Sequence, residues 1–203
     1  MLILSQSEII YLIFVMIITA IPAGFAAGLF GIGGGLITVP ILFYIFTRAG
    51  IDPSYVMHLS VGTSFGIIIP TSIVSVLTHH QHKAVDFKVV RGFGLSVVTG
   101  VILGTILAAN LSTKPLILYF TIVVYGLAFY LLFLKEKGEN LDIKIGFLAK
   151  TLAGIVSGFV SAPMGIGGAV MNVPILKYFG YHINKAIGSA AAIWFVIALF
   201  VAM

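Results

Sequence analysis

The sequence has no cysteine and few charges, since only 8% of its 203 residues are Asp, Glu, Lys or Arg. The absence of cysteine excludes disulfides, thiolate nucleophiles and cysteine-ligated metal or iron–sulfur sites. The six carboxylates lie outside the long apolar runs, so no proton relay through buried acids is supported. No serine, histidine and acid are placed to meet as a hydrolase triad. We therefore expect no enzyme activity and no cofactor.

Apolar residues make up 60% of the chain, and its mean hydropathy is +1.19. Soluble domains carry about 25% charged residues, so this composition is typical of a protein in lipid. Six stretches have no Asp, Glu, Lys or Arg: 9–47, 53–82, 92–113, 115–134, 151–176 and 186–203. Most approach or exceed the roughly 20 apolar residues that one membrane-spanning helix needs. The sequence predicts an integral membrane protein in which the charges mark the loops.

The predicted fold class is all-α, a polytopic membrane helix bundle of about eight helical segments. We expect these segments near residues 9–30, 33–47, 57–78, 88–110, 115–134, 145–163, 166–180 and 185–203. The second and the seventh have only about 15 residues, or about 22 Å at 1.5 Å per residue. This is shorter than a hydrocarbon core of about 30 Å, so both are expected to be half-helices or shallow spans.

The net charge of +5 does not indicate nucleic-acid binding, because the basic residues are scattered through short loops. Those near 79–91, 135–144 and 177–185 fall on one predicted side, while Arg48 and Lys114 fall on the other. The positive-inside rule places the first group in the cytoplasm and the N-terminus outside. The histidines at 79, 80 and 82 have no carboxylate nearer than Asp86, so interfacial histidines are favoured over a metal site.

One pattern occurs twice: a glycine cluster that runs into an apolar stretch containing proline. The copies read GIGGGLITVPIL at residues 31–42 and GIGGAVMNVPIL at residues 165–176. A duplicated unit that breaks its membrane helices at matching points is typical of transporters built from two related halves. Counting the opening helix of the first unit itself, five predicted segments precede the opening helix of the second. If all five cross the bilayer, the repeats are inverted in topology.

We therefore expect a single transmembrane domain over residues 1–203. Repeat unit 1 covers about 9–110, a linking helix covers 115–134, and repeat unit 2 covers about 145–203. The second unit has no counterpart of the helix at 88–110, so the sequence predicts that it is incomplete at its C-terminal end.

The glycine clusters are candidates for an anion site. A helix that restarts after such a cluster presents unpaired N–H groups and the positive end of its dipole, which together attract anions without a basic side chain. Hydroxyl and amide side chains at matching places in the two repeats would complete the site. The predicted substrate-binding residues are Gly31, Gly33, Gly34, Gly35, Thr38, Thr63, Ser64, Gly165, Gly167, Gly168, Asn172 and Ser189.

Helix packing is the alternative explanation for glycine in this chain. Small residues four apart let membrane helices approach closely. Such pairs occur at Gly24 and Gly28, Gly62 and Gly66, Gly100 and Gly104, and Gly154 and Gly158. We expect packing roles for these pairs, whereas the two consecutive, repeated clusters favour binding or permeation.

The doubled glycine–proline motif resembles the signature of the sulfite exporter TauE/SafE family of membrane permeases. Residues 62–64 and 188–190 fit as well, and the resemblance extends over essentially the whole chain. It implies a small duplicated permease of the cytoplasmic membrane that moves sulfur oxyanions or organic anions such as sulfite and sulfoacetate. The resemblance gives a substrate class and not one substrate.

Two functions remain open from the sequence. The first is a secondary transporter for a small anion, with the bilayer as its surroundings and a proton or sodium as a possible coupling ion. The second is a non-transporting membrane scaffold or assembly protein whose glycine motifs serve helix packing only.

Overall fold

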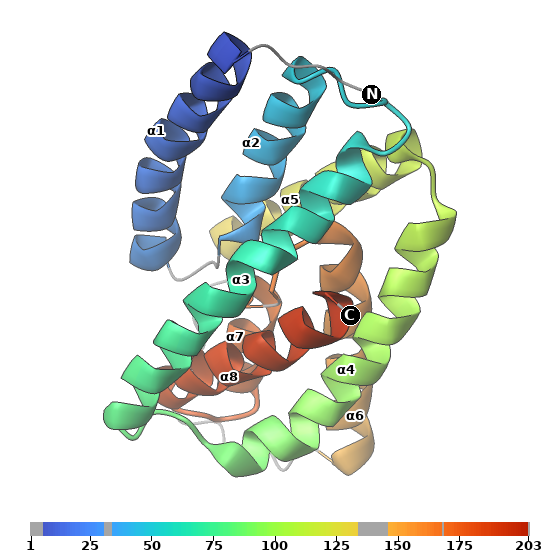
Figure 1. Ribbon diagram of the computed structural model, residues 1–203. Helices are drawn as coiled ribbons and strands as arrows, with labels where there is room; N and C mark the ends of the chain where they lie inside the picture. Colours follow the sequence, from blue (N-terminus) through green and yellow to red (C-terminus); the bar gives the residue numbers. More distant parts are fainter. Residues whose placement is uncertain (1–5, 31–33, 134–145, 168, 203) are drawn as a thin grey trace.

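The computed structural model describes residues 6–30, 34–133, 146–167 and 169–202, and these contain helices and no strand. The elements are α1 (Gln6–Phe30), α2 (Gly35–Arg48), α3 (Val56–Gln81), α4 (Phe87–Asn110), α5 (Thr113–Phe133), α6 (Phe147–Ser161), the 3₁₀ turn η1 (Ala162–Met164), α7 (Ala169–Tyr178) and α8 (Ile183–Ala202). They form one helical bundle, with α8 crossing its middle between α3 and α4 (Figure 1). The all-α prediction is confirmed.

Four stretches of the described residues are long and apolar enough to cross a membrane. They are Val56–Gln81, Phe87–Asn110, Thr113–Tyr130 and Phe147–Met164. Large apolar side chains are exposed along them, including Leu77, Leu95 and Tyr125. A water-soluble surface would not expose so many such side chains, but a surface in contact with lipid does. The protein is a multi-pass integral membrane protein.

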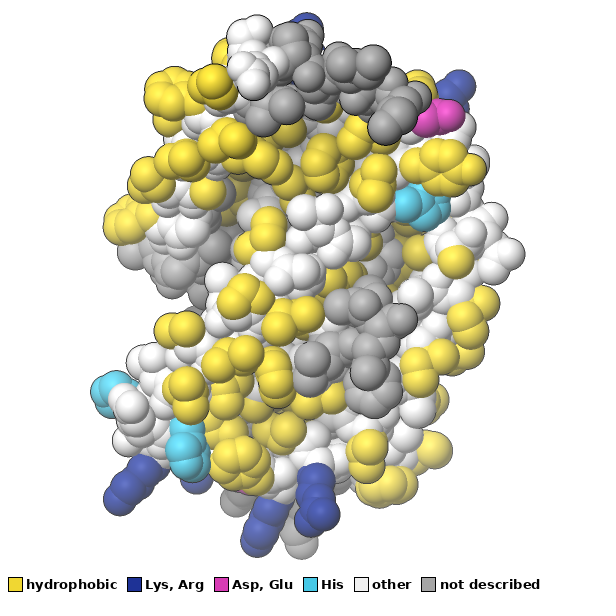
Figure 2. Space-filling view, viewed as in Figure 1, with side chains coloured by type: hydrophobic (Ala, Val, Ile, Leu, Met, Phe, Trp, Pro, Cys, Tyr) yellow, Lys and Arg dark blue, Asp and Glu magenta, His cyan; other side chains and the backbone are white. Residues whose placement is uncertain are grey.

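The molecule has two polar ends. The lower end in Figure 1 holds the end of α3 and the start of α4, and the upper end holds the start of α3 and the end of α4. Lys and Arg side chains gather at these ends, and apolar side chains cover the surface between them (Figure 2). Thr113 Oγ1 donates a 2.7 Å hydrogen bond to the Ser54 carbonyl at the upper end. This distribution fits a bilayer around the middle of the bundle.

Helices α4 and α6 pack closely through their glycines. A Cβ added to Gly100 would overlap the carbonyl oxygen of Ile155, and one added to Gly158 would overlap that of Val97. Gly104 and Gly154 are similarly crowded. The packing role predicted for these two pairs is therefore confirmed, because any larger side chain would separate the two helices.

The same prediction is wrong for Gly62 and Gly66 within this chain. A Cβ added at either position, or at Gly24, would meet no atom of the described residues within 4 Å. All three lie on exposed faces of α1 and α3. Spacing of four residues places two glycines on one helix face, but it does not say whether another helix covers that face.

The two short helices α2 and α7 both occur where half-helices were predicted. In Figure 1, α1 and α2 form a hairpin whose open ends lie at the upper end, so α2 starts near mid-height. The end of α7 lies at the lower end, because Phe179 packs edge-on against Phe93 in the second turn of α4, with ring centroids 5.9 Å apart. The two half-helices therefore run toward opposite ends. Inverted repeats would produce this arrangement, and the repeat boundaries remain a prediction.

Helix α7 is shorter than expected, Ala169–Tyr178 in place of 166–180. Gly165 has a left-handed φ of +65° that ends the preceding 3₁₀ turn, and Ile166 and Gly167 after it are not yet helical. A helix cannot continue through that conformation, so α7 restarts beyond the glycine cluster.

Candidate functional site

The two glycine clusters meet inside the bundle. A Cβ added to Gly35, the first residue of α2, would overlap the carbonyl oxygen of Gly165 and lie 2.8 Å from Cα of Ile166. Only glycine allows the two backbones to approach this closely. Two sequence segments that were predicted to act together are thus in direct contact, at the point where α2 begins.

Gly165 is fixed from several sides. A Cβ at this position would lie 2.8 Å from Cγ2 of Val39 and 3.2 Å from Cα of Val61. Its left-handed backbone also disfavours any other residue. The Gly165 carbonyl is consequently held against the start of α2 by both conformation and packing.

A chain of hydroxyl groups connects α2, α3 and the second cluster. Ser64 Oγ donates a 2.9 Å hydrogen bond to the Gly165 carbonyl, and it lies 3.0 Å from Oγ1 of Thr38. Because a hydroxyl carries one proton, the Thr38 hydroxyl is the donor to Ser64. Ser64 is fully buried. The carbonyl at the start of α2 is therefore satisfied by a donor within the protein.

The matching position on α7 is different. Asn172, in the first turn of α7, is fully buried beside Ser157 of α6, whose Oγ lies 2.5 Å from Asn172 Oδ1. The amide nitrogen Nδ2 of Asn172 is buried and has no hydrogen-bond partner among the described residues. A buried donor without a partner costs about 1–3 kcal/mol. Such a group in a membrane protein indicates a place that a ligand can complete.

Trp194 is a site residue that the sequence reasoning missed. A Cβ added to Gly167 would lie 3.3 Å from Cγ of the Trp194 indole and 3.5 Å from Cγ2 of Ile68. Gly167 therefore places the indole at the start of α7. The indole Nε1 is buried and also lacks a hydrogen-bond partner in the part of the chain that the structure describes. One signal was available in the sequence, since this is the single tryptophan of the chain, in a membrane helix following Ser189.

The remaining predicted site residues are distributed as follows. Thr63 is half-buried next to Ser64, and Gly34 precedes α2, where its carbonyl accepts the first backbone hydrogen bonds of the helix from Ile37 and Thr38. Ser189 lies apart from the cluster contact, since its hydroxyl accepts a 3.0 Å bond from the Asp86 backbone at the lower end. The predictions on Gly31, Gly33 and Gly168 fall outside the described residues.

The charged side chains lie near the ends of the helices, away from the contact between the two glycine clusters. The described lysines and arginines lie in loops, in the first two turns of helices or in their last turns, at positions 48, 83, 88, 91, 114, 150, 177 and 185. The described part of the chain has no group of three or more His, Asp or Glu that could hold a metal ion. In the lower loops, burial and then the nearby Asp86 carboxylate raise the pKa of Tyr181. The side-chain donors near the clusters are those of Ser64, Asn172 and Trp194, and these side chains carry no charge.

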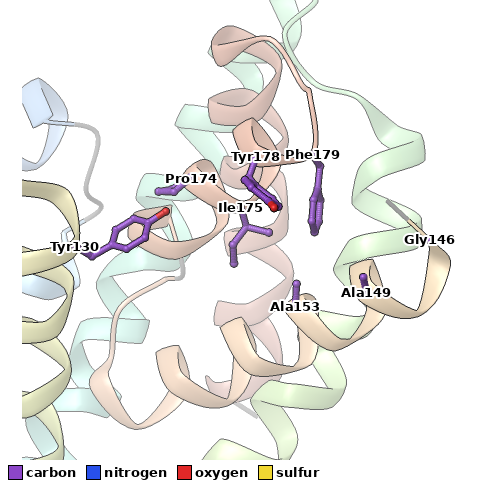
Figure 3. A pocket seen from close by; sticks show the side chains of 8 residues that line it. All are labelled: Tyr130, Gly146, Ala149, Ala153, Pro174, Ile175, Tyr178 and Phe179. Atoms are coloured by element: carbon purple, nitrogen blue, oxygen red, sulfur yellow. The ribbon is translucent and has the colours of Figure 1, made fainter. Parts of the chain in front are cut away.

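A cavity of about 520 Å³ lies elsewhere, between α5, α6 and α7 (Figure 3). Its lining is apolar apart from two tyrosines and consists of Tyr130, Gly146, Ala149, Ala153, Pro174, Ile175, Tyr178 and Phe179. Lys150 stands near it, with its amine 5.9 Å from the ring centroid of Phe179. None of the predicted binding residues lines this cavity, which lies toward the lower end. We regard the cluster contact, where unpaired donors are buried, as the better candidate site.

Comparison with known proteins agrees with this picture. A probable membrane transporter protein of Haemophilus influenzae is 34% identical over 169 residues, which cover 83% of this chain and 64% of that protein. One from Methanocaldococcus jannaschii is 28% identical over 194 residues, covering 95% of this chain and 72% of that protein. The chain thus spans about two thirds of the length of these relatives.

A third relative, a probable membrane transporter protein of Bacillus subtilis, is 23% identical over 180 residues, with 80% of this chain and 66% of that protein covered. No solved structure matches the chain. The profile of the family described as Sulfite exporter TauE/SafE matches residues 16–203. With the doubled glycine motif and the helical bundle that carries it, the chain belongs to the sulfite exporter TauE/SafE family.

Proposed function

We propose that this protein is a secondary transporter of the cytoplasmic membrane that moves a small anion. Its substrate class in this proposal is a sulfur oxyanion or an organosulfonate, and a proton or sodium gradient drives it. The proposal is supported by the family membership and by relatives that are named as probable membrane transporters.

The contact between the two glycine clusters is the observation that carries the proposal. Two half-helices begin near the middle of the bundle, and one of them has buried, unpaired side-chain donors at its start. Buried neutral donors suit an anion, because their N–H groups attract its negative charge. Substrate sites in transporters of this design lie near the bilayer midplane at the interface of the repeats. Relative movement of the two repeat units would then open the site to either side.

Flux into proteoliposomes tests the proposal. We expect the purified protein to carry sulfite or a small sulfonate faster than protein-free liposomes do. An imposed proton gradient and an imposed sodium gradient, applied separately, identify the coupling ion. If a folded, reconstituted protein moved none of sulfite, thiosulfate, methanesulfonate and acetate, the transport proposal would be wrong.

A membrane scaffold is the second candidate, and the same contact favours it. Gly35 and Gly165 touch so closely that a purely structural role would also require glycine at both places. The two functions differ at Asn172, because helix packing has no use for an unpaired amide. Loss of flux without loss of stability in an Asn172 variant would favour transport, and unchanged flux would favour the scaffold.

A further inference from the structure

We propose that the cavity between α5, α6 and α7 binds one acyl chain of an anionic phospholipid, whose phosphate is held by Lys150 at the edge of the cavity. This inference goes beyond the proposed function, since it gives a ligand to a cavity that none of the predicted substrate-binding residues lines. It does not depend on which substrate the protein carries.

The cavity is suited to a hydrocarbon chain. Its volume of about 520 Å³ lies within the range of about 300–1,000 Å³ that is usual for ligand pockets. Apart from two tyrosines, its lining residues are alanine, glycine, proline, isoleucine and phenylalanine. A chain of methylene groups fills such a space without losing hydrogen bonds to water. A small anion would give up its water there for few donors in return.

The shape of the cavity leads from the lower end of the bundle toward its middle. In Figure 3, Ala149 stands at one end of the row of lining side chains and Tyr130 at the other. Pro174 lies one helical turn before Tyr178, which is close to the lower end of α7. Tyr130, Ala149 and Tyr178 are also exposed at the surface of the bundle. An acyl chain can therefore enter from the surrounding lipid and point toward the middle of the bilayer.

Lys150 places a positive charge at the edge of this cavity. It lies in the first turn of α6, directly after the lining residue Ala149. Its amine is 5.9 Å from the ring centroids of both Phe179, another lining residue, and Tyr181. No described carboxylate forms an ion pair with Lys150, although Asp86 is close enough to Tyr181 to influence its phenol. A lipid phosphate would give the ammonium a charge-assisted hydrogen bond.

The charge of the lower end favours an anionic headgroup over a zwitterionic one. The described basic residues of this end are at positions 83, 88, 91, 150, 177 and 185, and the described carboxylate there is Asp86. Basic pockets between membrane helices on the cytoplasmic side typically hold anionic headgroups. Phosphatidylglycerol carries a net negative charge and phosphatidylcholine does not. The two lipids therefore separate the role of the charge from that of the acyl chain.

Lipid titration of the purified, delipidated protein in a mild detergent tests the proposal. Phosphatidylglycerol, phosphatidylcholine with the same acyl chains, and glycerol 3-phosphate are added separately. We expect phosphatidylglycerol to raise the thermal unfolding midpoint by at least about 2 °C more than phosphatidylcholine does. Glycerol 3-phosphate, which has no acyl chain, should cause no shift. Equal shifts with the two lipids, no shift with either, or the same shift with glycerol 3-phosphate would overturn the proposal.

Two variants and their matched controls locate the effect. Lys150→Gln removes the charge, so we expect the shift with phosphatidylglycerol to fall to that with phosphatidylcholine. Lys83→Gln, at an exposed position between α3 and α4, should keep the full difference. Ala149→Trp places a large ring at the edge of the cavity and should abolish the shift, whereas Ala109→Trp at the exposed end of α4 should not. A full shift in both Lys150→Gln and Ala149→Trp would place the lipid elsewhere and overturn the site.

Photolabelling of the unaltered protein decides the question if these variants fail to fold. The probe is phosphatidylglycerol with a diazirine in one acyl chain. We expect mass spectrometry to find its crosslinks at residues 130, 149–153 and 174–179. Labelling of the exposed face of α3 to the same extent would show ordinary lipid contact and overturn the site. Flux is measured in none of these experiments, so their failure leaves the transport proposal standing, and absent flux leaves the lipid site standing.

Discussion

At the scale of single residues, glycine and asparagine have distinct duties in this protein. Gly35 and Gly165 allow two backbones to touch, which is a matter of volume. Asn172 buries an amide that is only half satisfied, which costs stability. Tight packing explains the first feature but not the second. The two kinds of residue should therefore respond differently to substitution.

The added methyl group of Gly35→Ala would overlap the Gly165 carbonyl. We expect the free energy of unfolding to fall by about 1–3 kcal/mol, because neither backbone can move aside freely. Thermal unfolding in detergent measures it. Gly34→Ala is the matched control, because its nearest new neighbour is Cγ2 of Thr38 at 3.8 Å. Equal unfolding midpoints for both variants would contradict the close contact.

Asn172→Leu separates stability from transport. It removes a buried unpaired donor and also the acceptor of the Ser157 hydroxyl, two effects of opposite sign and similar size, so we expect an unfolding midpoint close to that of the unaltered protein. Anion flux should fall at least about tenfold, as expected for a lost charge-assisted hydrogen bond of about 1.5–3 kcal/mol. Asn110→Leu at the exposed end of α4 is the matched control and should keep full flux. Flux that survives in Asn172→Leu would remove Asn172 from the proposed site.

At the scale of elements, the bundle combines rigid contacts and open faces. Helices α4 and α6 approach through the crowded Gly100, Gly104, Gly154 and Gly158. Gly66 of α3 has no neighbour where a side chain would be. The hairpin of α6 and α7 is thus anchored on α4, which fixes the height at which α7 starts.

Gly158→Ala and Gly66→Ala form a pair that tests this difference. The first would overlap the Val97 carbonyl, and we expect it to lower stability by about 1–3 kcal/mol. The second should be neutral or raise stability by up to about 1 kcal/mol, because alanine is the better helix former. Comparison of the two unfolding midpoints checks the prediction. A destabilising Gly66→Ala would indicate that another helix covers that face.

At the scale of the whole molecule, the segregation of charge predicts an orientation in the membrane. Basic residues of the α3–α4 and α7–α8 connections share the lower end, as the contact of Ser189 with Asp86 requires. Arg48 and Lys114 lie at the upper end. From the positive-inside rule we predict that the lower end faces the cytoplasm.

The absence of cysteine makes this orientation simple to test. Ser54→Cys at the upper end and Gln81→Cys at the lower end introduce single exposed thiols. We expect a membrane-impermeant maleimide to label Ser54→Cys in intact cells, and Gln81→Cys only after permeabilisation. The unaltered protein is the unlabelled control. The opposite labelling pattern would reverse the topology.

The sequence by itself determined the helical class, the membrane setting and the two half-helices. These depend on local properties: uncharged apolar runs give spans, and consecutive glycines interrupt them. It also identified Thr38, Ser64 and Asn172 as polar groups of the repeats. The family resemblance rested on the same short motif.

Only the tertiary structure decided which of these groups meet. It joined Thr38 and Ser64 to Gly165, set Ser189 against Asp86 at the lower end, and brought Trp194 to the start of α7. It also distinguished crowded glycines from open ones. Contacts between residues about a hundred positions apart depend on how whole helices cross, and no spacing rule within one helix contains that information.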